Sequence, residues 1–330
     1  MRRTDALRSH EGTMNLPWDQ TRKPLMLAPM QGITNCALRS LFVEWVRPDV
    51  VFTEFVRVRP GSKQAMSNAD LREVTSIHQD VPLVVQLVGS NQEALVAAAQ
   101  IAQDQGARHI NINMGCPRGR MTSGAGGGAL LKYPSCLPDL LHAVRRVVHG
   151  SLSVKIRSGY DTPGQIFTLL PMFEDVGLDF LVLHARTVKE KYGGQADHTI
   201  SAEVVKQTTL PVIVNGDINS AAHGNDVLTS TNAAGLMLGR GAIGSPLLFQ
   251  RLRGKCSIKP GREERVEELV YYLRELVSRY QGIFHGNTQI LHKLKEVVCF
   301  ILDTDFALPI KAMKRSRTME EFLGHLDQIA

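Results

Sequence analysis

The chain lacks the cysteine patterns of disulfide scaffolds and zinc sites. Its 330 residues include five cysteines, and none of them forms a C-x-x-C pair. The five are widely separated along the chain: Cys36, Cys116, Cys136, Cys256 and Cys299. An odd number of scattered cysteines is typical of a compartment that keeps thiols reduced. We therefore expect a cytoplasmic protein with no disulfide framework and no bound metal.

Long apolar runs are absent too. No uninterrupted stretch approaches the ~18 apolar residues that suggest a membrane span, so no membrane association is expected. Residues 1–23 are polar and basic, and they lack the apolar core that a signal peptide has. We expect this extension to be disordered, with Met14 as an alternative start. Lys and Arg outnumber Asp and Glu by 38 to 32, which weakly favours a polyanionic partner.

Residues 24–254 alternate short apolar runs with longer amphipathic segments such as Asn91–Gln105 and Pro138–His149. Each run is apolar on both faces, as in a parallel strand that is covered on both sides. Eight strands in strict alternation with helices predict a (β/α)₈ TIM barrel, an α/β fold. The runs are Pro24–Met30, Val50–Phe55, Leu83–Val88, His109–Asn113, Leu152–Arg157, Asp179–His184, Pro211–Asn215 and Ala234–Gly239.

The competing fold, an open doubly wound sheet, fits the sequence less well. Such a sheet usually carries a G-x-G-x-x-G turn after its first strand. Here that turn, residues 28–32, has the sequence APMQG. The barrel is therefore the preferred prediction.

No strand pattern appears after Arg253. Apolar residues instead recur at helical spacing in Glu263–Tyr280, Gln289–Leu302 and Met319–Ile329. We predict a small C-terminal helical domain over residues 255–330, which includes the basic segment Lys311–Arg317.

Polar side chains stand at the ends of the predicted strands. Catalytic groups of a barrel lie at the C-terminal ends of its strands and in the loops that follow. One polar residue in one apolar strand would mean little, but a ring of them indicates a site. The ring contains Gln31, Glu54, Gln86, Asn111, Asn113, Lys155, Arg157, His184, Asn215, Asp217 and Arg240.

The motifs along the barrel resemble, in order, those of the tRNA-dihydrouridine synthases. They are A-P-M-x-G, T-E-F, N-x-G-C-P with a glycine-rich loop after it, K-x-R, H-x-R-T, N-G-D-I and G-R-G-A. Residues 53–58 and 123–129 look most like the DusC branch. The resemblance implies an FMN-dependent oxidoreductase that uses NADPH to reduce a tRNA uridine to 5,6-dihydrouridine. For the DusC branch, that uridine lies in the D-loop, at position 16.

Cys116 is the expected general acid. The reduction adds a hydride to C6 of uracil and a proton to C5. A thiol with an ordinary pKa near ~8.5 is protonated at neutral pH and can deliver that proton. The alternative is a small buried apolar side chain, which we expect for the other four cysteines. The position of Cys116 on a strand-end turn between Gly115 and Pro117, together with the resemblance, favours catalysis.

The expected FMN site spans several strand ends. Barrels often bind phosphate in the loops after strands seven and eight, where glycines let backbone N–H groups approach. Lys155 is expected to stabilise the anionic reduced ring. The alternatives are an ion pair between Lys155 and Glu54, and a purely structural His184. The site residues are Pro29, Met30, Gln31, Gln86, Lys155, His184, Asn215, Gly216, Asp217, Gly239 and Arg240.

The expected substrate contacts come from both domains. Asn113 and Arg157 resemble family residues that hold uracil, whose N–H and carbonyls suit an amide and a guanidinium. The run Gly124–Gly128 is not a phosphate-binding Walker loop, and we expect a flexible lid. A stacked base must be flipped out of the RNA. Phosphate contacts are expected from Lys293, Lys295, Lys311, Lys314, Arg315 and Arg317, although a merely solvated basic surface is the alternative.

Two other functions stay open at this stage. One is an FMN barrel that acts on a free pyrimidine, of the dihydroorotate or dihydropyrimidine type. The extra helical domain favours RNA over it. The other is a catalytically silent RNA-binding protein, against which Cys116 and Lys155 argue.

Overall fold

The computed structural model describes residues 15–329 except 59, 62–65, 77–79 and 118–125. Eight parallel strands form a closed ring, and β2 pairs with β4 to complete it. The ring order is β2-β1-β9-β8-β7-β6-β5-β4, and a short strand, β3 (Val56–Arg57), pairs with β4. The eight are β1 (Leu25–Leu27), β2 (Val50–Phe52), β4 (Leu83–Val88), β5 (His109–Met114), β6 (Ser151–Gly159), β7 (Phe180–Thr187), β8 (Val212–Asn215) and β9 (Gly235–Leu238).

Every predicted apolar run overlaps one of these strands, so the predicted TIM barrel is confirmed. Helices surround the strands, and several begin at a side chain that accepts a backbone N–H, as Asn91 does for α3. They are α1 (Cys36–Trp45), α2 (Asn68–Thr75), α3 (Gln92–Asp104), α5 (Leu137–Val147), α6 (Gln165–Val176), α7 (His198–Gln207) and α8 (Ala221–Thr231), with the shorter α9 (Arg240–Gly244), α10 (Leu248–Leu252) and the 3₁₀ turns η1 (Gly127–Lys132) and η2 (Pro134–Cys136).

The barrel interior is filled by apolar side chains at the end opposite the strand C-termini. Met26, Phe52 and Phe180 belong to this inner cluster, and Leu16 and Trp18 pack against it. The Trp18 and Phe180 rings meet edge to face with centroids 5.0 Å apart. Leu16 and Trp18 thus cover apolar surface at the open end of the ring, whereas residues 19–23 are exposed. Residues 1–14, including Met14, lie outside the described part of the chain.

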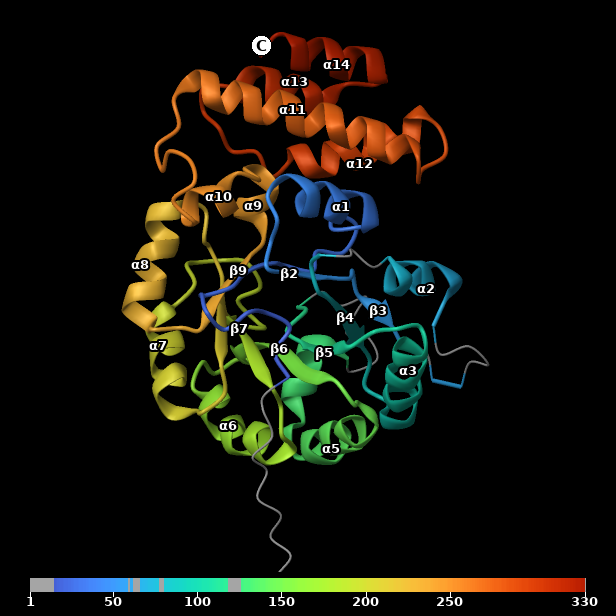
Figure 1. Cartoon of the computed structure of the whole chain (residues 1–330), viewed down its shortest axis with the longest axis vertical. Coiled ribbons are helices and arrows are strands. Elements are labelled where there is room, and N and C mark those ends of the chain that lie inside the picture. The colour runs from blue at the N-terminus through green and yellow to red at the C-terminus, as the bar shows by residue number, and fades with distance from the viewer. Residues whose placement is uncertain (1–14, 59, 62–65, 77–79, 118–125, 330) are drawn as a thin grey trace, which may run out of the picture.

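Four helices follow the barrel and lie over α1, α9 and α10, at the top of Figure 1. They are α11 (Arg262–Gln281), α12 (Asn287–Val298), α13 (Ala307–Arg315) and α14 (Met319–Asp327). This confirms the C-terminal helical part of the predicted fold. Helix α13, which carries most of the basic segment, was not predicted as a helix; Pro309 stands in its first turn.

A buried interface joins the helical unit to the barrel. Phe42 of α1 contacts Phe249 of α10 and Tyr272 of α11, with ring centroids 6.2 and 6.0 Å apart. Arg251 and Glu268 form an ion pair at 2.6 Å, and both side chains are buried. Apolar packing and a buried charge pair fix the two parts against each other.

Trp18→Ala should lower the free energy of unfolding by about 3 kcal/mol, the lower end for tryptophan truncation, because the side chain is only partly buried. Leu308→Ala is the control: that side chain is 81% exposed, and the change should stay within about 0.5 kcal/mol. Urea unfolding measures both. Equal stability of the two variants would show that the Trp18 ring contributes nothing to the stability of the barrel.

Candidate active site

Two adjoining cavities open at the C-terminal ends of the strands. One, of about 340 Å³, is lined by the ends of β8 and β9; the other, of about 500 Å³, is lined by the ends of β5 and β6. They form one cleft of a size that suits a cofactor together with a small substrate group. The two share Pro29, Met30, Lys155, His184, Tyr192 and Phe300.

Cys116 lies on a tightly held turn in the wall of the larger cavity. Asn113 Oδ1 accepts the backbone N–H groups of Gly115 at 3.1 Å and Cys116 at 3.0 Å. Arg157 Nε donates to the Gly115 carbonyl at 2.9 Å, and the Gly128 N–H donates to the Cys116 carbonyl at 3.0 Å. These contacts fix the backbone that carries the thiol, and Cys116, which is 9% exposed, lines the cleft.

A chain of buried amides supports this turn from below. Asn113 Nδ2 donates to Gln86 Oε1 at 2.8 Å, and Gln86 Nε2 donates to Asn111 Oδ1 at 2.7 Å. Asn111 Nδ2 continues the chain to Ser153 Oγ at 2.8 Å. Gln86 does not line either cavity, so its amide orients Asn113 in this structure. Each amide has a partner at both ends, which locks the orientation of all three.

Lys155 stands between the two cavities. Its Nζ donates to Asn215 Oδ1 at 2.8 Å, and Asn215 Nδ2 donates to the Met237 carbonyl at 2.8 Å. Burial, together with the nearby Arg157 guanidinium, lowers the pKa of Lys155 to about 7. The contact that Lys155 makes is with an amide and not with Glu54, so the ion-pair alternative is not found.

The ends of β8 and β9 form an arginine-rich corner. Asp217 accepts hydrogen bonds from Arg186 at 2.5 Å and from Arg240 at 2.9 Å. A Cβ on Gly241 would lie 2.2 Å from the Ile218 carbonyl oxygen, so only glycine lets the two loops approach this closely. Gly216, with φ +127°, and Gly239 lie on the cavity wall beside Arg240.

His184 is neutral in this corner. Its Nε2 lies 3.2 Å from Arg186 Nη1, and a guanidinium can only donate, so Nε2 accepts. Burial lowers the pKa of His184 well below its usual value, and the charges of Lys155, Arg157, Arg186 and Arg240 act in the same direction. His184 is therefore an unprotonated side chain on the wall shared by both cavities.

Arg157 is buried and holds three backbone carbonyls. Besides Gly115, it donates to Thr187 at 2.8 Å and Lys191 at 2.5 Å. Its guanidinium also lies 5.4 Å from the Tyr192 ring centroid. Arg157 thus connects the Cys116 turn to the loop after β7 while it lines the larger cavity.

Comparison with known proteins identifies the family. The model of the dihydrouridine synthases (Dus) matches residues 26–307. The chain belongs to the dihydrouridine synthase family. It is 30% identical over 274 residues to tRNA-dihydrouridine synthase B of Pasteurella multocida, covering 81% of each chain. It is 34% identical over 238 residues to the protein of that name from Vibrio cholerae, covering 71% of this chain and 72% of the relative.

A solved structure shares the fold. A 2-naphthoyl-CoA reductase in complex with 2-naphthoyl-CoA superposes with a TM-score of 0.55 at 11% identity, over 70% of this chain and 50% of that one. At this identity the likeness shows the fold alone.

Family membership confirms the predicted tRNA-dihydrouridine synthase and disfavours the free-pyrimidine alternative. The finer prediction of the DusC branch is not confirmed, because the relatives given above carry the letter B. Among the described residues, no group of three His, Cys, Asp or Glu side chains could hold a metal ion. In the same part of the chain, no helix is long and apolar enough to cross a membrane.

Several residues of the synthase cleft were missed by the sequence-based prediction. Tyr192 follows β7, and its ring lies 5.1 Å from the Arg240 guanidinium; its place in a strand-end loop was the available signal. Glu296, Cys299 and Phe300 reach the larger cavity from the end of α12. No pattern in the sequence indicates them, because their role arises only when the helical unit docks on the barrel.

The glycine-rich run is only partly described, since residues 118–125 lie outside the described chain. Its last glycines pack beside the Cys116 turn. A Cβ on Gly128 would lie 3.0 Å from the Cys116 carbonyl oxygen and 2.8 Å from a Val188 methyl group. Gly127 has a φ of +62°, which favours glycine. Gly127 and Gly128 therefore allow close packing against Cys116. The flexible lid stays a prediction from sequence.

Lys155→Met should change how stability depends on pH. The folded-state pKa of Lys155 is about 7, and that of the unfolded lysine is near 10.5. Between these values the unfolded chain binds a proton that the folded chain does not, so the parent gains stability as pH rises through this window. The variant lacks this gain. Urea unfolding of cofactor-free protein at about pH 7 and pH 9.5 should show the variant losing stability relative to the parent. A pH-independent difference would contradict the assignment.

Proposed function

We propose that this chain reduces a uridine of tRNA to 5,6-dihydrouridine with bound FMN and NADPH as the source of electrons. The observation that carries the proposal is the cleft itself: the Cys116 thiol, the Lys155 ammonium and the arginine-rich corner face one space. The family of the chain supports the same chemistry.

The residues of the smaller cavity fit an FMN. Lys155 donates to the Asn215 amide, which is uncharged and does not neutralise the lysine's positive charge. A positive charge at this place suits an anionic flavin ring. Arg240, Gly216 and Gly239 offer a guanidinium and close backbone approach for the phosphate. Pro29, Met30 and Gln31 would lie along the ring edge. When bound, FMN supplies the hydride.

The residues of the larger cavity would position and protonate the base. We place the flipped uracil beside Asn113 and Arg157, which line this cavity with Cys116. Cys116 Sγ would hold the proton for C5, and the bonds from Asn113, Arg157 and Gly128 keep the turn that carries it fixed. The amide of Gln86 would act on this arrangement through Asn113.

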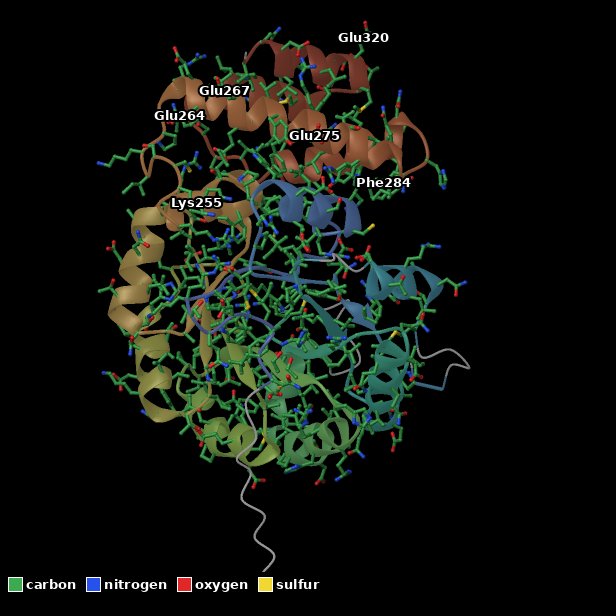
Figure 2. All side chains as sticks on the ribbon, in the orientation of Figure 1. Lys255, Glu264, Glu267, Glu275, Phe284 and Glu320 are labelled. Atoms are coloured by element: carbon green, nitrogen blue, oxygen red, sulfur yellow. The ribbon has the colours of Figure 1, made fainter. Side chains whose placement is uncertain are left out.

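The tRNA is proposed to contact the helical domain, residues 255–330, through α13 and its C-terminal end. Residues 307–317 contain four basic side chains and no acidic one: Lys311, Lys314, Arg315 and Arg317. Figure 2 places Glu264, Glu267 and Glu275 along α11, which also carries four arginines, so α13 differs from α11 in having basic side chains without acidic ones. Lys295 bonds the Ser316 carbonyl at 2.8 Å and supports this segment. The D-loop target at position 16 and the cytoplasmic location stay predictions from sequence.

Charge reversal on α13 tests the partner. Replacing Lys311, Lys314 and Arg315 by Glu should weaken tRNA binding and lower the log–log salt slope by about one for each lost phosphate contact. Reduction of the flavin by NADPH should be unchanged. The matched control reverses Arg47, Arg146 and Lys206, which are exposed on the barrel. Equal tRNA affinity and salt slope for both variants would remove α13 from the interface.

Cys116→Ala tests the chemistry. The variant should keep flavin and tRNA binding, and kcat for dihydrouridine formation should fall ~10²–10⁴-fold, the usual contribution of a general acid. Turnover is measured by mass spectrometry, as the dihydrouridine formed in tRNA that lacks this modification at the start. Cys136→Ala, at an exposed cysteine outside the cleft, should behave as the parent does. Normal turnover by the Cys116 variant would mean that another group supplies the proton.

A further inference from the structure

The turn after β1 lies at the junction of the barrel and the helical domain. Pro29, Met30 and Gln31 of this turn line the larger cavity, and Gly32 follows them. The turn closes with its own bonds: the N–H groups of Ile33 and Thr34 donate to the Met30 carbonyl at 2.9 and 3.0 Å. Its position therefore sets one wall of the cleft.

The barrel holds this turn from one side through Glu54, at the end of β2. Gln31 Nε2 donates to Glu54 Oε2 at 3.2 Å, and Gln31 Oε1 accepts the Phe55 N–H at 3.1 Å. Burial raises the pKa of Glu54 to about 7, and the Gly32 N–H acts in the opposite direction. The Glu54 carboxyl group therefore faces the turn and holds Gln31 close to the end of β2.

The helical domain holds the same turn from the other side. Lys293 Nζ on α12 donates to the Gly32 carbonyl at 3.1 Å and to Glu296 Oε2 at 2.8 Å. Gly32 has a φ of +83°, and a Cβ there would lie 3.4 Å from Lys293 Nζ. The contact joins residues 261 positions apart in the sequence. Glycine at this position brings the backbone within reach of the ammonium.

The geometry points to Lys293 as a positioning residue: it fixes the Gln31–Gly32 turn of the catalytic cleft from the helical domain. The helical domain then does more than bind RNA, because α12 completes the wall beside the proposed flavin and uracil. The ammonium of Lys293 donates to a carbonyl and to a carboxylate of the protein, which distinguishes it from the exposed Lys311 of α13. This inference rests on the proposed function only for its kinetic consequence.

Lys293→Met tests the inference, since it keeps the apolar stem and removes the donor. In cofactor-free protein, the amides of Ile33 and Thr34 should exchange with deuterium at least about tenfold faster, because the turn that protects them loses its anchor. With FMN bound, the visible spectrum should shift. At saturating tRNA, kcat should fall ~10–100-fold, as misplacement of a cleft wall does, while KM for tRNA changes less than about threefold.

Two comparison variants make the test specific. Lys206→Met removes an ion pair of the same kind, Lys206 to Glu203 at 2.7 Å, from the outer helix α7, and it should leave exchange, spectrum and kinetics unchanged. Lys293→Arg restores a donor and should recover most of the protection and the kcat.

The outcomes separate the inference from the proposed function. Unchanged exchange at Ile33 and Thr34 in Lys293→Met overturns the positioning role. A raised KM for tRNA with unchanged kcat also overturns it and makes Lys293 an RNA contact. If the parent reduced no tRNA, the proposed function would fail, while the exchange measurement would still decide whether Lys293 holds the turn.

Discussion

Eight parallel strands can close into a ring only if their inward side chains fill the space that the ring encloses. The inner cluster around Met26, Phe52 and Phe180 meets this requirement at one end, and Trp18 covers that end from outside the strands. All strands run the same way, so their C-terminal ends meet at the other end. Polar groups there stand close together in a partly enclosed space, where each needs a partner or costs free energy.

The partners found there explain how the cleft is built. Asn113 Oδ1 accepts a hydrogen bond from the backbone of the Cys116 turn, and Asn113 Nδ2 donates to Gln86. Lys155 takes the Asn215 amide, and Asp217 takes both Arg186 and Arg240. A network in which every group is paired keeps a single arrangement, and that rigidity holds a thiol and an ammonium in fixed positions. Burial and, after it, the nearby cations lower the pKa of both His184 and Lys155.

The helical domain shares the site with the barrel. Phe42 and Tyr272 join the two through apolar contact, and the Arg251–Glu268 pair lies within the same interface. With the domain fixed there, the end of α12 brings Phe300 to both cavities and Lys293 to the Gly32 carbonyl. The proposed RNA contact on α13 and the proposed chemistry in the barrel are thus connected through this interface.

The sequence by itself determined the barrel, since strands covered on both faces must be apolar on both faces, and it located the polar strand ends, since parallel strands end together. Cys116, Lys155, His184 and Arg240 were found in this way, and they do line the cleft. Only the tertiary structure decided that Gln86 lies behind Asn113, that Arg157 binds three carbonyls, and that Lys293 faces the barrel. Each of these depends on a contact between residues that are distant in the sequence. Local patterns of polarity do not indicate which distant residue a side chain will contact.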